Sequence, residues 1–217
     1  MKIDLITITV LKNFAKINPS ILIKEGNLLR TVSPTKTTAG EAVVPTTFNK
    51  QFAIYNLDRF LSAASLFDDP DFDFDDKFVT ISNGNTSTQY MYADEDTIKK
   101  VSDKKLVLPS IDASFDLSFN NYKSVEKALG VLNLPEIAIC GDGKNISILA
   151  IDTKNPTSDV HSIKIGETDK TFRAIFKSEN IKILPMDYHV DISSKGFAHF
   201  QSDNIEYWIA VEQSSTF

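Results

Sequence analysis

Apolar residues near the start of the chain recur at the spacing of an α-helix. They are Val10, Leu11, Phe14 and Ile17, which fall on one face of a helix. Pro19 follows, and proline cannot continue a helix interior because it lacks the backbone N–H. The pattern predicts a short helix over residues 9–17.

The next segments show strand patterns and turn residues. Residues 20–30 contain two apolar runs separated by Lys24–Asn27, where Gly26 can adopt the dihedral angles of a tight turn. We expect these two runs to form a hairpin. Residues 71–92 alternate polar and apolar side chains around the turn dipeptide Asn83-Gly84, which predicts further antiparallel strands.

A second short helix is predicted between these strands. Residues 48–55 have the character of a strand, and either Asn56 or Asp58 is placed to cap a helix after it. The apolar side of this helix would consist of Leu57, Phe60, Leu61, Ala64 and Leu66.

The second half of the chain repeats this order of elements. Residues 10–19 and 125–135 both carry a helical pattern, then an asparagine and a proline, and a hairpin pattern follows each. The further matches are Lys24–Asn27 with Asp142–Asn145, Phe52–Tyr55 with Arg173–Phe176, Asp71–Asp75 with Asp187–Asp191, and Tyr90–Ala93 with Tyr207–Ala210. Order and spacing hold across many elements, which favours an internal duplication over a chance recurrence of a common helix–hairpin order.

The duplication predicts an α+β chain of two similar domains, each with antiparallel strands and two short helices. The first domain is expected over residues 1–95 and the second over residues 110–217, with a connector over residues 96–109. The fourth helix is expected around residues 178–184, where Pro185 would end it early.

Composition is that of an ordinary folded chain. Of 217 residues, 42% are hydrophobic and 24% are charged. No apolar run approaches the roughly 20 residues needed to cross a bilayer, and the start lacks the apolar core of a signal peptide, so we expect a cytoplasmic protein with no membrane partner. The single cysteine, Cys140, cannot form an internal disulfide, which fits a reducing compartment.

Basic residues gather on the predicted helices although the net charge is −6. Lys12 and Lys16 are four residues apart and so share one helix face, as do Lys123 and Lys127. The second helix carries Arg59, and the fourth candidate carries Lys177 and Lys182. Lysine is common on any exposed helix face, but its recurrence on four equivalent helices favours non-specific contact with a phosphate backbone. No aromatic residues interleave with these cations, so duplex DNA is a better partner than a single strand.

Two sequence features that could suggest a calcium site or a phosphate loop are better explained as structure. The acidic stretch Asp68–Asp76 lacks the glycine and glutamate that a calcium loop needs, since Asp76 and Ser82 stand at those positions. It reads instead as an edge strand with Phe72 and Phe74 turned inward. Gly141–Asn145 reads as a hairpin turn and not as a phosphate loop.

No nucleophilic site is indicated either. The candidate bases are His161, His189 and His199, and neither they nor Cys140 stand in a pattern that pairs a nucleophile with a base. We therefore expect no enzymatic activity, no metal and no cofactor.

Two segments of the first half resemble the sliding clamps of T-even-type bacteriophages. The first is Leu-Lys-Asn-Phe-Ala-Lys-Ile-Asn over residues 11–18, followed by an apolar strand and Gly26. The second is Ala-Ile-Tyr-Asn-Leu-Asp-Arg-Phe-Leu over residues 53–61, followed by Leu66 and an acidic run. The second half is similar mainly by pattern, ending in an aromatic-rich strand and a short tail.

This resemblance implies a DNA clamp fold in which three protomers close head to tail into a ring, with helices lining the hole and strands outside. It implies a processivity factor that encircles duplex DNA, tethers the replicative DNA polymerase and is placed on DNA by an ATP-dependent clamp loader in the host cytoplasm. The DNA-facing residues would be the lysines and Arg59 named above. It also implies an apolar pocket near the connector for the C-terminal peptide of the polymerase, with Leu106, Leu108, Pro109, Ile209 and Val211 as its candidates.

The competing class is a non-enzymatic, β-rich structural or adaptor protein of a virion. The acidic and strand-rich composition motivates it. A monomeric mass in solution, together with no effect on polymerase processivity, would favour that class.

Overall fold

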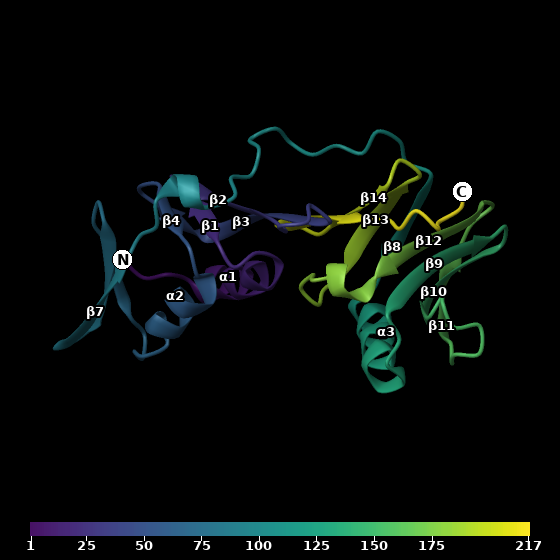
Figure 1. Ribbon diagram of the computed structural model, residues 1–217, viewed down its shortest axis with the longest axis horizontal. Helices are drawn as coiled ribbons and strands as arrows, with labels where there is room; N and C mark the ends of the chain where they lie inside the picture. The colour runs from purple at the N-terminus through teal and green to yellow at the C-terminus, as the bar shows by residue number, and fades with distance from the viewer. The chain divides into compact units, whose positions relative to one another are not determined.

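A computed structural model describes all 217 residues, which form two compact units, residues 1–104 and 105–217 (Figure 1). The first unit contains α1 (Leu5–Ile17), β1 (Ile21–Ile23), β2 (Gly26–Val32), β3 (Thr38–Phe48), β4 (Phe52–Ile54), α2 (Leu57–Ala64), β5 (Asp71–Phe74), β6 (Phe78–Asn83), β7 (Thr86–Met91) and a 3₁₀ turn (Glu95–Thr97). The second contains β8 (Ala113–Leu117), α3 (Phe119–Leu132), β9 (Glu136–Asp142), β10 (Asn145–Ile151), β11 (His161–Glu167), β12 (Thr171–Lys177), a 3₁₀ turn (Ser178–Asn180), β13 (Tyr188–Ser193), β14 (Phe197–Gln201) and β15 (Ile205–Ala210).

The predicted first helix is confirmed, and it begins earlier than its apolar stripe suggests. The carboxylate of Asp4 accepts a hydrogen bond from the backbone N–H of Ile6 at 2.7 Å, which caps the helix one residue before Leu5. Asn18 returns the chain to an extended conformation before Pro19. The apolar pattern does not predict the extra turn, because its buried position is the polar Thr7 while the apolar Leu5 and Ile6 are exposed.

The predicted hairpin over residues 20–30 is wrong. β1 pairs antiparallel with β4, and β2 pairs with β3. Gly26, at a φ of +109°, turns the chain out of β1 and into the ladder with β3, so this corner joins two ladders and not the two arms of one hairpin. The predicted strand over residues 48–55 is also divided, because the chain leaves the ladder of β3 after Phe48 and enters that of β4 at Phe52.

The strands predicted over residues 71–92 are confirmed as the antiparallel sheet β5-β6-β7. Asn83 pairs with Thr86 across the turn, and Gly84 has the positive φ that such turns require. Phe72 and Phe74 are buried while the aspartates between and before them are exposed, as expected for a solvated edge strand. The core beneath is aromatic: Phe74 packs on Phe48 and Phe52.

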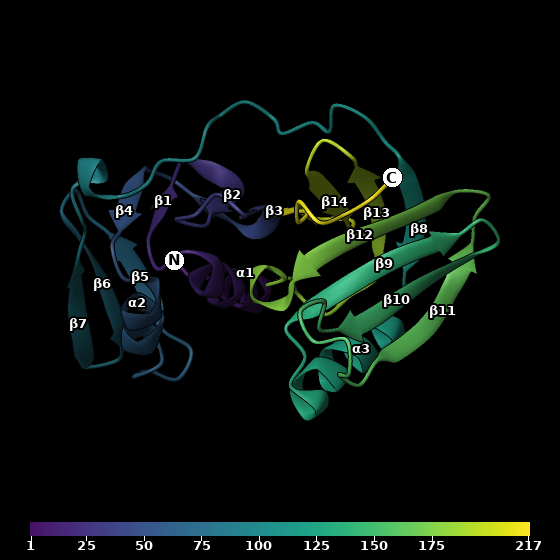
Figure 2. The same ribbon diagram turned by 45° about the vertical axis from the view of Figure 1, so that its right-hand side comes forward.

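The second unit contains two antiparallel ladders, β11-β10-β9-β12 and β15-β14-β13-β8. The hairpin turn predicted at Gly141–Asn145 is confirmed, since Gly141 pairs with Ile146 and the carboxylate of Asp142 accepts the backbone N–H of Asn145 at 2.7 Å. Helix α3 packs on β10 and β11 (Figure 2). Its buried residues, Tyr122, Val125 and Ala128, recur every third position and so face the sheet.

The two units have the same order of strands, which confirms the predicted duplication. The pairings β1–β4, β2–β3 and β5-β6-β7 match β9–β12, β10–β11 and β13-β14-β15 respectively. Even β8, which pairs with β13, has a counterpart: Met1 exchanges two backbone hydrogen bonds with Phe72 of β5.

The fourth helix, predicted around residues 178–184, is wrong, so the second unit has one α-helix and not two. Only the 3₁₀ turn Ser178–Asn180 forms there. Pro185 disfavours helical dihedrals at Leu184, and the backbone of Leu184 is satisfied by side chains instead. The hydroxyl of Tyr207 accepts its N–H at 3.3 Å, and the hydroxyl of Tyr188 donates to its carbonyl oxygen at 2.7 Å. No helix of the chain is long and apolar enough to cross a membrane.

Candidate nucleic-acid interface

Helix α1 presents an exposed face whose only charged side chains are cations. Lys12 and Lys16 are exposed, on the side opposite the buried Leu11 and Phe14. Neither lysine side chain has a hydrogen-bond or ion-pair partner, and α1 contains no acidic residue. Both ammonium groups are therefore available to a phosphate.

Helix α2 packs beside α1 and adds Arg59. Of the two predicted caps, Asn56 is the one that caps this helix: its side-chain oxygen accepts the backbone N–H of Arg59 at 2.9 Å. The guanidinium is exposed, but Asp58 is exposed next to it, so this helix has no excess of positive charge. Arg59 also lies near Tyr90, whose pKa is raised by burial and partly lowered again by that cation.

Helix α3 carries Lys123 and Lys127 on its exposed side. Ser118 caps it by accepting the backbone N–H of Asn121 at 3.3 Å. The ammonium of Lys123 lies 5.4 Å from the ring centroid of Phe119, within the range of a cation–π contact. Glu126 is exposed on the same helix, so its net charge is lower than that of α1.

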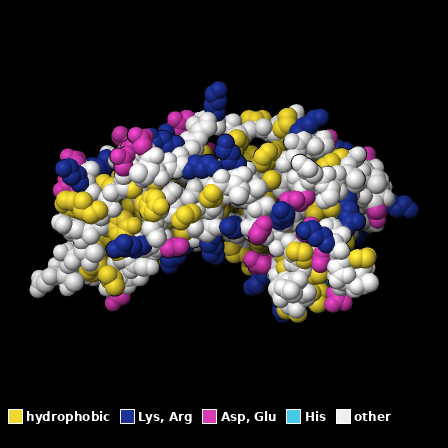
Figure 3. All heavy atoms as spheres, in the orientation of Figure 1, with side chains coloured by type: hydrophobic (Ala, Val, Ile, Leu, Met, Phe, Trp, Pro, Cys, Tyr) yellow, Lys and Arg dark blue, Asp and Glu magenta, His cyan; other side chains and the backbone are white.

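The last two predicted cations do not lie on a helix. Lys177 ends β12, with its ammonium 4.0 Å from the carboxylate of Glu212, and Lys182 is half-buried after the 3₁₀ turn. Figure 3 shows that cationic and anionic side chains lie close to one another over the visible face of each unit, without a large field of one sign. Contact of all seven residues with DNA stays a prediction.

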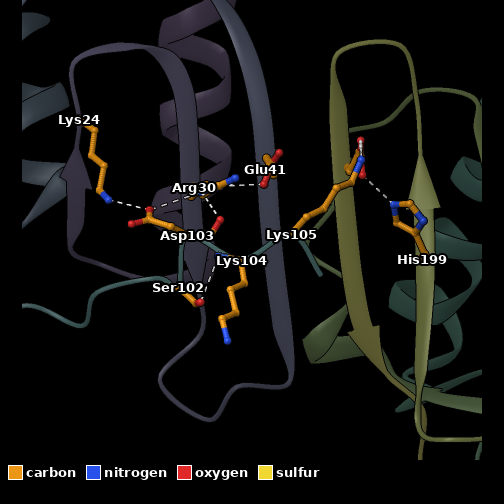
Figure 4. Close-up of polar contacts among 9 residues, drawn as sticks. Lys24, Arg30, Glu41, Ser102, Asp103, Lys104, Lys105 and His199 are labelled. Carbon is orange, nitrogen blue, oxygen red and sulfur yellow. Dashed lines mark hydrogen bonds and ion pairs between the residues drawn. The ribbon is translucent and has the colours of Figure 1, made fainter. Parts of the chain in front are cut away.

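The candidate pocket residues differ in accessibility. Leu106 and Pro109 are exposed, Leu108 and Val211 are half-buried, and Ile209 is fully buried in β15, where it offers no surface to a peptide. In the second unit the ammonium of Lys105 lies 4.0 Å from the carboxylate of Glu206. The same carboxylate lies 2.9 Å from the Nε2 atom of His199 (Figure 4).

Sequence reasoning missed a cleft in the first unit. It lies between β1, β2 and the segment Lys99–Asp103, and its lining includes Ile21, Leu22, Leu28, Val32 and Val101. The carboxylate of Asp103 lies 2.6 Å from the ammonium of Lys24 and 3.6 Å from the guanidinium of Arg30, which Glu41 also holds at 2.8 Å (Figure 4). No local pattern could reveal this site, because Lys24 and Asp103 are 79 positions apart.

Clamps are among the solved structures that this chain is similar to. They include PCNA from A. fulgidus with the C-terminal region of FEN-1 bound (TM-score 0.71, 13% identity, 96% of both chains covered). They also include the Helicobacter pylori beta clamp bound to a DNA ligase peptide (TM-score 0.72, 12% identity, 98% of this chain and 65% of that chain). At this identity the likeness concerns the fold alone: the duplicated α+β units have the DNA clamp fold, as predicted.

Comparisons with known sequences identify the family to which the chain belongs. The family model described as DNA polymerase processivity factor matches residues 2–100, and the model described as gp45 sliding clamp, C terminal, matches residues 114–213. The sliding clamp of Vibrio phage KVP40 is 33% identical, over 98% of this chain and 99% of the relative. That of Enterobacteria phage T4 is 27% identical, over 100% and 99%. The chain belongs to the sliding clamp family of T4-like phages, which confirms the resemblance seen in residues 11–18 and 53–61.

Proposed function

We propose that this protein is a sliding clamp that confers processivity on a DNA polymerase by encircling duplex DNA, and that it is not an enzyme. The observation that carries the proposal is the 33% identity to a phage sliding clamp along nearly the whole chain. The duplicated clamp fold supports it independently, since closure around DNA needs a shape and not a catalytic group. The competing class, a structural or adaptor protein of a virion, is not favoured by these relatives.

The ring would be a homotrimer closed through open sheet edges. β7 pairs only with β6, and β11 pairs only with β10, so each leaves one row of backbone groups unpaired. Met91 on β7 and Val160 beside β11 are exposed apolar side chains at these edges. Pairing of β7 of one protomer with β11 of the next would give the backbone groups of both edges hydrogen-bond partners. Repetition of this head-to-tail contact by rotation would close the ring.

DNA would pass along the helices. Lys12, Lys16, Lys123 and Lys127 would make weak phosphate contacts, with Arg59, Lys177 and Lys182 as further members of this surface. A net charge of −6 keeps the rest of the protein from adhering to nucleic acid, so the tether depends on closure and the clamp can move along the duplex.

Partner proteins would bind through short peptides. The partners proposed are the C-terminal peptide of the DNA polymerase and an ATP-dependent clamp loader, in the cytoplasm of the host cell of a phage. Two clamps of the same fold were solved with peptides from other proteins bound, one from FEN-1 and one from a DNA ligase. In this chain the cleft between β1, β2 and Lys99–Asp103 has the apolar lining such a peptide needs.

A topological test distinguishes encirclement from ordinary binding. The protein is loaded on nicked circular DNA with the clamp loader of the same phage and ATP, and then the circle is cut once with a restriction enzyme. We expect the protein to stay on the circle and to leave the linear DNA through its ends. Equal retention on both forms, or a monomeric mass with no stimulation of the polymerase, would contradict the proposal.

A further inference from the structure

The cleft of the first unit has an apolar lining and a cationic rim. Ile21 is buried at its base, Leu28 is exposed at its mouth, and Lys24, Arg30 and Lys99 supply the positive charge. The ammonium of Lys99 donates to the carbonyl oxygen of Pro34 at 2.5 Å. Lys24 and Arg30 are the two cations of the rim that already bind a carboxylate.

Both cations are bridged by one carboxylate of the chain. Asp103 lies 2.6 Å from Lys24 and 3.6 Å from Arg30, and its backbone carbonyl accepts from Arg30 at 3.4 Å. We call these contacts the Asp103 bridge. The carboxylate of Asp103 is readily displaced, because its side chain is 71% exposed and exposed ion pairs are weak in water. The hydrogen bond from Lys24 lowers the pKa of Asp103 below its ordinary value.

Arg30 keeps its position when Asp103 leaves, because a second carboxylate holds it. The Nε atom of Arg30 donates to the carboxylate of Glu41 at 2.8 Å, and both side chains are only about one-fifth exposed. This pair comes from β2 and β3, not from the linker segment. The guanidinium is therefore oriented toward the cleft by the sheet, ready for another carboxylate.

The segment that carries Asp103 presents to the cleft the same kinds of group that a bound peptide would present. Val101 lines the cleft, and Asp103, two positions later, reaches the cationic rim. An extended peptide with an apolar residue two positions before an acidic one would present the same groups in the same order. Exchange of one carboxylate for another preserves the ion pairs, while the larger apolar side chain of a partner buries additional surface.

We propose that Asp103 is an internal competitor for partner peptides: an acidic side chain of the peptide replaces it at Lys24 and Arg30, so that the cleft selects peptides with an apolar-x-acidic pattern. The inference rests on the proposed function, in which this cleft receives a partner peptide. It adds the chemistry of the peptide and a regulatory contact at the same site.

The test uses the full chain and two fluorescein-labelled peptides with amidated C-termini, one containing Leu-Ser-Asp and one containing Leu-Ser-Asn. Fluorescence anisotropy gives the Kd of each. Asp103→Asn should bind the Asp peptide about two- to fivefold more tightly than the unmodified protein, the range of one exposed ion pair. In the Asp103→Asn background, Lys24→Gln should weaken the Asp peptide by a similar factor, because the peptide carboxylate then loses a partner that Asp103 no longer occupies. Neither change should alter binding of the Asn peptide.

Asp96→Asn is the matched control. Asp96 pairs with Lys100 at 3.1 Å, is exposed, and lies in the 3₁₀ turn just before the segment Lys99–Asp103, outside the cleft. Its loss should leave both Kd values unchanged. Peptide binding that does not respond to Asp103→Asn would overturn the competitor role alone. If neither peptide binds to any variant, the peptide site of the proposed function is refuted as well. If Asp96→Asn also binds the Asp peptide more tightly, the change in Kd comes from net charge and not from the Asp103 bridge.

Discussion

The side-chain amide of Asn18 donates to the backbone carbonyl oxygen of Val32 at 2.8 Å. The amide oxygen of the same residue accepts the backbone N–H of Ser20 at 2.9 Å, and Asn18 is only 4% exposed. Its counterpart in the second unit, Asn133, is exposed and ends α3 with a φ of 51°. The asparagine that recurs after both helices therefore tethers α1 to β2 in one unit and serves as a left-handed helix cap in the other.

Replacement of Asn18 by alanine should lower the free energy of unfolding by about 1–3 kcal/mol, because it removes a buried amide that donates to the half-buried Val32 and accepts from Ser20. Urea denaturation followed by circular dichroism measures this. Asn133→Gly is the control and should change stability by less than about 0.5 kcal/mol, since glycine accepts a positive φ. Equal effects at both positions would refute the difference in role.

The placement of the helical lysines depends on how α1 is packed. Phe14 is fully buried, so Phe14→Ala should lower the free energy of unfolding by about 3–5 kcal/mol through lost contacts and a cavity. Lys12→Ala, on the exposed side of the same helix, should stay within about 0.5 kcal/mol. Thermal and urea denaturation check both values, and a small loss for Phe14→Ala would show that α1 packs by another face.

Charge reversal tests the DNA surface. Changing Lys12, Lys16, Lys123 and Lys127 to Glu should leave folding intact but impair loading and sliding. The slope of log affinity for DNA against log salt concentration should also decrease in magnitude, by up to about 4. The measurements are retention on nicked circles and affinity across a salt series. The control changes Lys77, Lys144, Lys154 and Lys195 to Glu, which are exposed lysines outside the helices. If the control loses as much tethering, net charge and not the helix faces controls binding.

A histidine on β13 makes stability depend on pH. The ring of His189 lies 2.8 Å from Asp116 of β8 and 3.4 Å from Asp191, and the hydrogen bond to Asp116 is the main reason that its pKa is raised above 6.5. Because the folded pKa exceeds the unfolded one, the stabilisation is complete below pH 6.5 and is lost as the pH rises through the raised pKa. The difference in Tm between the unmodified protein and His189→Gln should therefore shrink from about pH 6 to about pH 8. A difference that is constant over this range would exclude a charged His189 bridge.

Local sequence determined much of the fold. The apolar stripe of α1, the Asn56 cap of α2, the Asn83-Gly84 turn and the inward Phe72 and Phe74 follow from periodicity and turn chemistry within a few residues. The duplication could also be predicted from the sequence, because these local signals occur in the same order in both halves. The placement of Lys12, Lys16, Lys123 and Lys127 on exposed faces follows from the same helical spacing.

Tertiary structure alone decided which strands are neighbours and which side chains meet. Apolar character marks a strand but not its partner, so only the whole sheet assigned β1 to β4 in place of the nearer β2. Hydroxyls of Tyr188 and Tyr207 satisfied the backbone where a fourth helix was expected. The meeting of Asp103 with Lys24 and Arg30 was likewise invisible in sequence, because contacts between distant segments depend on the packing that folding the whole unit selects and not on local preference.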